Sequence, residues 1–129
     1  MERVVGAILR AEDQFLLGHR HPGRHSYPNV WDVPGGRIEP GESAESAIVR
    51  ELSEELGIEL DPESLTPWRM AETEGYALQL FVIDNWIGEV TNTEPEEHDR
   101  LSWFGVDDLP NLRLASPIYV ELLVSAMKS

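Results

Sequence analysis

Three glutamates in the segment from residue 44 to residue 56 have the spacing of a shared helix face. A helix turns by about 100° per residue, so Glu55 and Glu54 lie roughly 40° and 60° to either side of Glu51. Neighbouring carboxylates repel one another unless a cation or solvent screens them. Hard oxygen donors at this spacing suit Mg²⁺, Mn²⁺ or Ca²⁺. The spacing alone nevertheless favours an ordinary solvated acidic face, and Arg50 is placed to pair with Glu54.

An apolar stripe lies beside these acids on the helical wheel, about 60° to 140° from Glu51. It consists of Ile48, Leu52 and Leu56. Such a stripe can pack on a sheet while the acids remain on the adjoining face. Ser43 is a suitable N-cap and Gly57 a suitable stop, which predicts a helix over residues 44–56.

Runs of β-branched and aromatic residues predict the strands that would support this helix. They cover residues 4–9, 14–20, 30–33, 66–72, 76–86 and 101–104. The first two are expected to form a hairpin. Pro34, Gly35 and Gly36 are expected to end the third strand, followed by a loop over residues 37–42. Helical spacing returns over residues 117–128, so the order of elements predicts an α/β fold with a mixed sheet between helices.

The size and charge of the chain restrict its partners. Its 129 residues suit a single domain over residues 1–129. Lys and Arg number 10 against 24 Asp and Glu, which gives a formal net charge of −14. This charge argues against nucleic-acid polymers and anionic membranes as partners. A phosphate-bearing small molecule stays possible, because bound Mg²⁺ or Mn²⁺ can reverse the local sign of the charge.

The chain contains no cysteine, which excludes disulfides, thiolate catalysis and Cys-ligated zinc. This composition is compatible with a reducing compartment. The apolar run near the start is too short for a signal peptide, and no other run approaches about 18 uninterrupted apolar residues. We therefore expect a cytoplasmic protein.

The segment from Gly36 to Ile58 resembles the signature of the Nudix hydrolases, G-x5-E-x7-R-E-U-x-E-E-x-G-U, in which U is a bulky aliphatic residue. The defined positions are Gly36, Glu42, Arg50, Glu51, Leu52, Glu54, Glu55, Gly57 and Ile58. Length and element order are similar to those of the small MutT-type members, as are residues 31–35 before the signature and Trp103-Phe104 after it. The resemblance implies the Nudix α/β/α sandwich with a mixed β-sheet between helices.

In that family the signature holds metal ions against a diphosphate, and the resemblance carries these roles to the matching positions. The implied ligands of Mg²⁺ or Mn²⁺ are Glu51, Glu54, Glu55 and the carbonyl group of Gly36. Arg50 and Glu42 would orient the carboxylates. Glu54 and Arg50 would also take part in catalysis.

Small members of the family often recruit a further glutamate from a later loop, as metal ligand or base. Counting back from Trp103, Glu97 matches this position best and Glu96 next, with Glu94 and Asp99 in the same loop. We expect Glu97 to be a metal ligand and a catalytic residue. A solvated acidic loop is the alternative interpretation.

Three residues outside the signature are candidate substrate contacts. Arg20 resembles a phosphate-contacting arginine of MutT-type enzymes, although plain solvation also fits it. Its basic neighbours are His19, His21, Arg24 and His25. Trp31 could stack on a base, but core packing is the more frequent role of such a residue. Ser116 stands near the place where MutT-type enzymes carry an Asn that reads oxidised guanine, and could hydrogen-bond a base less selectively.

The resemblance implies metal-dependent hydrolysis of a phosphate anhydride, with a (d)NTP or modified NTP cleaved to NMP and pyrophosphate. ADP-ribose, a dinucleoside polyphosphate or another nucleotide derivative is the alternative substrate. Two other classes are a non-catalytic Nudix-fold nucleotide-binding module and an acidic metal-buffering or interaction protein. The intact Glu51, Glu54 and Glu55 favour the enzyme. A monomer and a homodimer are both compatible with the sequence.

Overall fold

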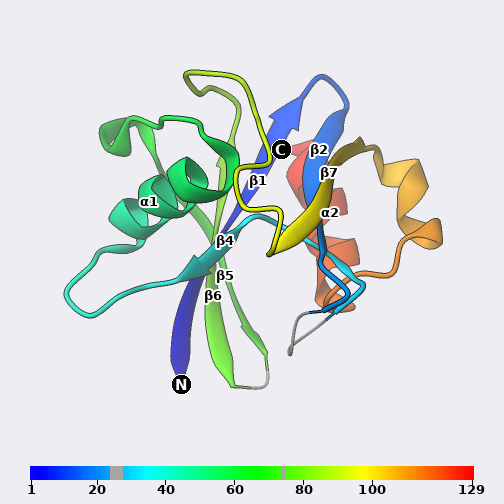
Figure 1. Cartoon of the computed structure of the whole chain (residues 1–129), viewed down its shortest axis with the longest axis horizontal. Coiled ribbons are helices and arrows are strands. Elements are labelled where there is room, and N and C mark those ends of the chain that lie inside the picture. Colours follow the sequence, from blue (N-terminus) through cyan, green and yellow to red (C-terminus); the bar gives the residue numbers. More distant parts are fainter. Residues whose placement is uncertain (24–27, 74) are drawn as a thin grey trace.

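A mixed β-sheet lies between the helices α1 and α2 in the computed structural model of the chain, which describes residues 1–23, 28–73 and 75–129 (Figure 1). The strands are β1 (Glu2–Ala11), β2 (Gln14–Arg20), β3 (Trp31–Asp32), β4 (Gly35–Arg37), β5 (Pro67–Thr73), β6 (Tyr76–Ile83) and β7 (His98–Phe104). The helices are α1 (Ala44–Leu56) and α2 (Ile118–Lys128), with 3₁₀ turns η1 (Pro62–Ser64) and η2 (Val106–Asn111). The predicted fold class and the predicted hairpin of β1 and β2 are confirmed.

The strands follow the order β3-β2-β1-β6-β5, with β4 added to β1 and β7 added to β2. β1 and β6 are parallel, and the other pairs are antiparallel. On the edge opposite β6, β1 divides its length between two strands: residues 4–6 pair with β4, whereas Arg10 and Ala11 pair with β2. β3 and β4 follow each other in the chain but pair with different strands, β3 with β2 and β4 with β1. Val33 lies between them in the sequence and lines a cleft.

The two faces of the sheet bury alternate side chains of β1. Val5, Ala7 and Leu9 pack in the cluster that includes α1, whereas Ile8 packs in the cluster that includes α2. The predicted apolar stripe of α1 is fully buried in the first cluster: Ile48, Leu52 and Leu56. The second cluster holds the buried face of α2: Tyr119, Leu123 and Ala126. α1 is thus fixed on its apolar side, as its spacing predicted.

Both ends of α1 are capped where the sequence indicated. The hydroxyl oxygen of Ser43 accepts a hydrogen bond of 3.0 Å from the backbone N–H of Ser46. Gly57 adopts a left-handed conformation with φ 67°, and its N–H donates to the carbonyl oxygen of Ser53. A residue with a Cβ atom would be strained in this conformation. The predicted boundaries of the helix, residues 44–56, are confirmed.

The prediction that Gly35 and Gly36 end a strand and that a loop begins at Arg37 is wrong. Gly35–Arg37 form β4 and pair with residues 4–6 of β1. A Cβ atom on Gly35 would lie 2.0 Å from the carbonyl oxygen of Val5. The missing side chain here permits two backbones to approach closely instead of interrupting the strand.

Other boundaries also shift. β3 is shorter than the predicted residues 30–33, and β6 ends at Ile83 instead of residue 86. β7 begins at His98, earlier than predicted, because its pairing with β2 extends as far as Arg20. Arg24 and His25 of the basic stretch lie outside the described residues. Within residues 1–23, 28–73 and 75–129, no helix has the length and apolar character needed to cross a membrane.

Candidate active site

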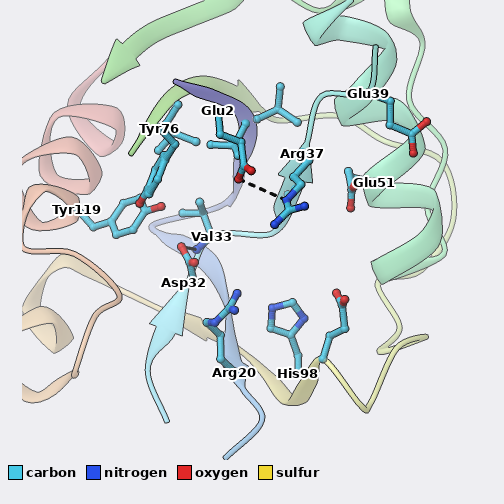
Figure 2. A pocket seen from close by; sticks show the side chains of 16 residues that line it. Glu2, Arg20, Asp32, Val33, Arg37, Glu39, Glu51, Tyr76, His98 and Tyr119 are labelled. Atoms are coloured by element: carbon cyan, nitrogen blue, oxygen red, sulfur yellow. Dashed lines mark hydrogen bonds and ion pairs between the residues drawn. The ribbon is translucent and has the colours of Figure 1, made fainter. Parts of the chain in front are cut away.

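A cleft of about 570 Å³ opens beside the acidic face of α1 (Figure 2). Its walls come from several strands and both α-helices. Figure 2 shows Tyr76 and Tyr119 on one side, Glu39 and Glu51 on the other, and Arg20 and His98 below them. Glu97 also lines the cleft. A cleft of this volume can hold a nucleotide-sized ligand.

Glu55 is the most deeply buried acid at this place, with only 1% of its surface exposed. Its Oε1 accepts a long hydrogen bond of 3.4 Å from the backbone N–H of Gly35. Its Oε2 is buried and has no hydrogen-bond partner within the described part of the chain. Burial raises the pKa of Glu55 well above its ordinary value, and the neighbouring Glu51 and Glu97 raise it further. A buried carboxylate in this situation requires a compensating cation or a proton.

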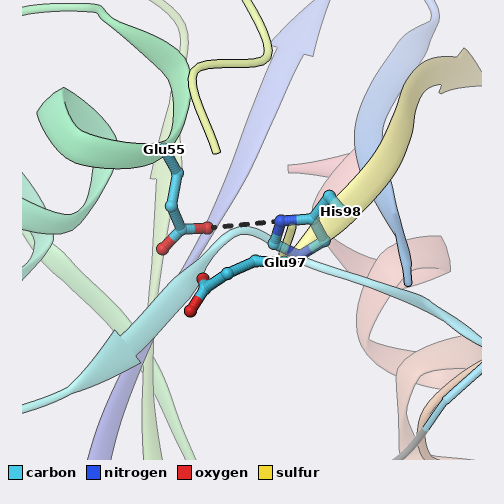
Figure 3. Close-up of side chains that lie close together, drawn as sticks. All are labelled: Glu55, Glu97 and His98. Atoms are coloured by element: carbon cyan, nitrogen blue, oxygen red, sulfur yellow. Dashed lines mark ion pairs between the residues drawn. The ribbon is translucent and has the colours of Figure 1, made fainter. Parts of the chain in front are cut away.

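Glu97 and His98 complete a cluster around Glu55 (Figure 3). One donor atom from each residue lies within 4.8 Å of the other two, and Glu55 Oε1 lies 4.0 Å from His98 Nδ1. A cation with ligands at about 2.1 Å places opposite donors roughly 4.2 Å apart, so small side-chain shifts would let these three share one ion. The orphaned Oε2 of Glu55 and this donor set fit a divalent metal.

The loop before β7 is held against the end of α1, which brings Glu97 and His98 over Glu55. The N–H of Thr93 donates to the carbonyl oxygen of Glu55 at 3.1 Å, and the N–H of Thr91 donates to that of Leu56 at 2.9 Å. These carbonyl groups have no partner within the helix, so the loop satisfies them. The chain then turns, because the N–H groups of Glu97 and His98 both donate to the carbonyl oxygen of Glu94.

Gly36 and Glu51 lie in contact at the mouth of the cluster. A Cβ atom on Gly36 would lie 2.5 Å from the carboxyl carbon and from Oε1 of Glu51. Both residues line the cleft. The structure therefore brings Gly36, Glu51, Glu55 and Glu97 of the predicted metal ligands together and adds His98.

Arg50 links the helix to the preceding loop. Its guanidinium group donates to both oxygens of Glu42, at 2.9 and 3.0 Å, and to Glu51 Oε1 at 2.9 Å. A further bond of 3.0 Å reaches the carbonyl oxygen of Arg37. These contacts lower the pKa of Glu42 to about 2 and raise that of Arg50. Arg50 thus fixes one orientation of the Glu51 carboxylate, which is the arrangement that the resemblance implies for it.

Glu54 occupies a different position from its neighbours. Its side chain is 52% exposed, and its Oε2 lies 3.4 Å from Nη1 of Arg50. Among the described residues, the wall of the cleft includes Glu51 but not Glu54. Of the acids that precede Trp103 and accompany Glu97, Glu96 is exposed, and Oδ1 of Asp99 lies 2.8 Å from Nδ1 of His19. Burial raises the pKa of Glu94, and the charge of Glu97 adds to this effect.

The three predicted substrate contacts lie in different surroundings. Arg20 lines the cleft. Trp31 packs edge-on against Phe104, with ring centres 4.8 Å apart, and lies outside the described wall of the cleft. Ser116 is also outside that wall, and its hydroxyl oxygen accepts a bond of 3.4 Å from the N–H of Ile118.

Most of the residues that line the cleft escaped prediction, among them Asp32, Tyr76, His98 and Tyr119. His98 directly follows a predicted ligand, and Tyr119 shares an i, i+4, i+7 spacing with Leu123 and Ala126, so both carried a weak signal. Burial raises the pKa of Tyr119 well above its ordinary value. The charge of Asp32 and a hydrogen bond to its carboxylate add to this shift, while Arg20 opposes it.

Comparisons with known proteins agree with this geometry. A family model described as the NUDIX domain matches residues 1–123. The chain is 32% identical over 129 residues to the CTP pyrophosphohydrolase of Escherichia coli K12, covering 98% of this chain and 92% of that protein. It is 31% identical over 116 residues to the 8-oxo-dGTP diphosphatase of the same organism, covering 85% and 88%. A MutT NUDIX hydrolase from Burkholderia pseudomallei has a similar structure, with a TM-score of 0.81, 28% identity and coverage of 98% and 95%.

Proposed function

Because the chain belongs to the Nudix hydrolase family, we propose that it cleaves a nucleoside triphosphate, or a modified one, to a monophosphate and pyrophosphate. The reaction would require Mg²⁺ or Mn²⁺. The observation that carries this proposal is the buried Glu55, whose Oε2 has no hydrogen-bond partner among the described residues and which lies close to Glu97 and His98. A purely structural carboxylate would be paired or exposed.

The metal would be held by Glu55, Glu97 and His98, with Glu51 and the Gly36 carbonyl group beside them. Its chemical contribution is to neutralise charge on the diphosphate and to make water more acidic. Carboxylates suit either ion, and the imidazole nitrogen of His98 suits Mn²⁺ better than Mg²⁺.

The side chains of the cleft supply the remaining steps. Water attacks one phosphorus atom of the α–β anhydride, and the bond from that atom to the bridging oxygen breaks. A carboxylate accepts the proton that the water releases. Glu97 lies in the cleft wall and is the base we propose, with the half-exposed Glu54 as the alternative. Arg50 keeps Glu51 oriented, and Arg20 contacts the phosphates.

A nucleoside triphosphate is the substrate class that the relatives support. Two similar proteins are named as a CTP pyrophosphohydrolase and an 8-oxo-dGTP diphosphatase, and both match most of the chain. ADP-ribose, a dinucleoside polyphosphate or another nucleotide derivative is the second candidate. We propose that the protein works in the cytoplasm as a monomer or homodimer. The absence of cysteine is compatible with that compartment.

The test is a panel of nucleoside triphosphates, ADP-ribose and diadenosine polyphosphates, each incubated with Mg²⁺ or Mn²⁺. The products are separated by anion-exchange chromatography, which detects pyrophosphate and monophosphate from a triphosphate, AMP from ADP-ribose and adenine mononucleotides from diadenosine polyphosphates, for the wild type, Glu55→Gln and Glu97→Gln. We expect turnover of at least one triphosphate and a loss of at least about 100-fold in both variants. Glu63→Gln, an exposed substitution of the same kind, should keep the wild-type rate. Nucleotide binding without turnover would indicate the non-catalytic binding module instead.

A further inference from the structure

We propose that Asn92 is a positioning residue for the cluster of Glu55, Glu97 and His98, and that it acts through the backbone of His98. Its side-chain amide holds His98 beside Glu55 before any metal binds, so that the ion meets a site that is already formed. This inference rests on the proposed function, because the cluster that Asn92 orders is the one proposed to hold the metal. Asn92 itself lies outside that cluster and outside the described wall of the cleft.

The side chain of Asn92 closes the loop that leads into β7. Its Nδ2 donates a hydrogen bond of 2.7 Å to the carbonyl oxygen of His98, which is six residues further along the chain. Inside this loop, the N–H groups of Glu97 and His98 both donate to the carbonyl oxygen of Glu94. Residues 92–98 thus form a loop that one side chain closes and a turn tightens. These bonds restrict the conformations of the residues within it.

The ladder between β2 and β7 is irregular at the point where Asn92 bonds to it. The register shifts after His19, so that Arg20 pairs with His98. Asp99 is left without a register partner in β2. A bulge of this kind disrupts the local pairing, so the strand alone holds the backbone of His98 less firmly than that of the residues after it. The hydrogen bond from Asn92 fixes the backbone at this weak position.

The residue after Asn92 ties the same loop to the last turn of α1. The N–H of Thr93 donates to the carbonyl oxygen of Glu55, and its hydroxyl group donates to that of Glu54. Asn92 and Thr93 are therefore adjacent residues that bond to β7 and to α1, respectively. Glu55 and His98 project from these two elements and approach to 4.0 Å (Figure 3). Because the two bonds connect the elements through one peptide unit, they determine how the two side chains meet.

The imidazole ring of His98 has little freedom once its backbone is fixed. A Cβ atom on Gly18 of β2 would lie 2.7 Å from Cδ2 of His98, so the ring packs directly against the backbone of Gly18. The side chain of His98 is buried. The direction of Nδ1 toward Glu55 therefore follows from the backbone position that Asn92 holds.

The amide of Asn92 is only half satisfied, which distinguishes it from a purely structural amide. Its Oδ1 is buried and has no hydrogen-bond partner within the part of the chain that the structure describes. Buried polar atoms are normally paired, and an unpaired oxygen is destabilising. This cost offsets the gain from the Nδ2 bond. We therefore expect Asn92 to contribute little to the stability of the fold and more to the order of the site.

Two substitutions of Asn92 test this role. Asn92→Leu keeps nearly the size of the side chain but has no N–H, and Asn92→Ala removes the whole amide. Mn²⁺ affinity, measured by calorimetry, should fall at least about tenfold in both variants, because a residue that orients metal ligands is lost. The metal-free melting temperature should stay close to that of the wild type. Asn111→Ala, which alters an exposed asparagine in η2, is the control and should change neither quantity.

The dependence of hydrolysis on Mn²⁺ concentration separates positioning from chemistry. The concentration that gives half the maximal rate should rise in both variants by the same factor as the dissociation constant. At saturating Mn²⁺, kcat should return to within about threefold of the wild-type value, because the metal then holds its own ligands in place. A loss of rate that excess Mn²⁺ does not restore would contradict a positioning role.

Amide hydrogen exchange in the metal-free protein tests the inference independently of the proposed function. The N–H groups of Glu97 and His98 should exchange at least about tenfold faster in both variants. That of Ala7, which donates to the carbonyl oxygen of Pro34 in the core, should not change. If these amides responded although the wild type neither bound Mn²⁺ nor cleaved a triphosphate, the proposed function would fall and the ordering role of Asn92 would stand.

The opposite outcome overturns the inference and leaves the proposed function intact. It consists of unchanged exchange, or of unchanged Mn²⁺ affinity, in variants that are folded. Failure of both variants to fold would also overturn it, because Asn92 would then support the whole domain and not the site.

Discussion

Glu55 Oε1 lies 4.0 Å from Nδ1 of His98, although one residue lies in the last turn of a helix and the other begins a strand far along the chain. Both side chains are buried, and Glu97 joins them within 4.8 Å. The loop that brings them together is tied to the carbonyl groups of Glu55 and Leu56. The end of α1 and the start of β7 therefore form one structural unit around the candidate metal site.

His98→Gln should change the metal preference of the protein. Imidazole nitrogen favours Mn²⁺ over Mg²⁺, whereas the carboxylates bind both. We expect Mn²⁺ affinity, measured by calorimetry, to fall at least about tenfold and Mg²⁺ affinity to fall less. His21→Gln, which alters a histidine outside the cluster, is the control and should leave both affinities unchanged. An equal loss for the two ions would show that His98 supports the site without selecting its metal.

Glu55→Gln should have opposite effects on stability in the absence and in the presence of metal. The variant removes a buried carboxylate whose Oε2 has no partner among the described side chains, so the metal-free protein should melt at the same or a higher temperature. Wild-type protein should be stabilised by Mn²⁺ in proportion to the logarithm of its concentration, and the variant should lose that response. Calorimetric melting curves with and without Mn²⁺ check both statements. If Mn²⁺ raised the melting temperature of the variant as much as that of the wild type, Glu55 would not be a metal ligand.

Glu42→Gln should alter the acid denaturation of the protein. Its hydrogen bonds from Arg50 lower the pKa of Glu42 to about 2 in the folded chain, below the value of about 4.3 for an unfolded Glu. The folded state therefore binds a proton at Glu42 less readily than the unfolded state does. The contribution of the Glu42 carboxylate to the free energy of unfolding is present above pH 4.3 and disappears as the pH falls toward 2. The free energy of unfolding, measured with urea between these pH values, should depend less steeply on pH in the variant than in the wild type. The rate of hydrolysis should fall about tenfold, because Arg50 loses a partner that orients it.

Gly36→Ala should displace the Glu51 carboxylate. A Cβ atom at this position would lie 2.5 Å from the carboxylate, too close for the present conformation. We expect at least about a tenfold loss of metal affinity. Gly105→Ala is the matched control, because its Cβ atom would meet only ordinary contacts, the nearest at 3.7 Å. Equal affinities in the two variants would contradict the placement of Gly36 and Glu51 beside the metal.

The sequence predicted α1 almost completely, because local signals determine it. Ser43, Gly57 and the apolar stripe define its ends and its buried face, and all three appear in the structure as expected. The helical wheel placed Glu54 and Glu55 on one acidic face. It could not show that Glu55 is buried while Glu54 is half exposed, because this depends on the loop that packs over the end of the helix.

Features that depend on distant segments were missed or misread. Gly35 stands in a Pro-Gly-Gly segment that is typical of a turn. It forms a strand instead because β1, which is distant in the sequence, approaches its backbone closely. His98 has no motif of its own and becomes part of the cluster only through the pairing of β7 with β2 and the turn at Glu94. Asp32 and Tyr119 likewise line one cleft only because β3 and α2 both border it.

The most direct measurement is the crystal structure of the protein soaked with Mn²⁺, with an anomalous difference map calculated for the metal. We predict a peak between the carboxylates of Glu55 and Glu97 and the imidazole ring of His98, and loss of that peak in Glu55→Gln crystals. A well-occupied manganese ion elsewhere, with no peak at this cluster, would contradict the proposed metal site.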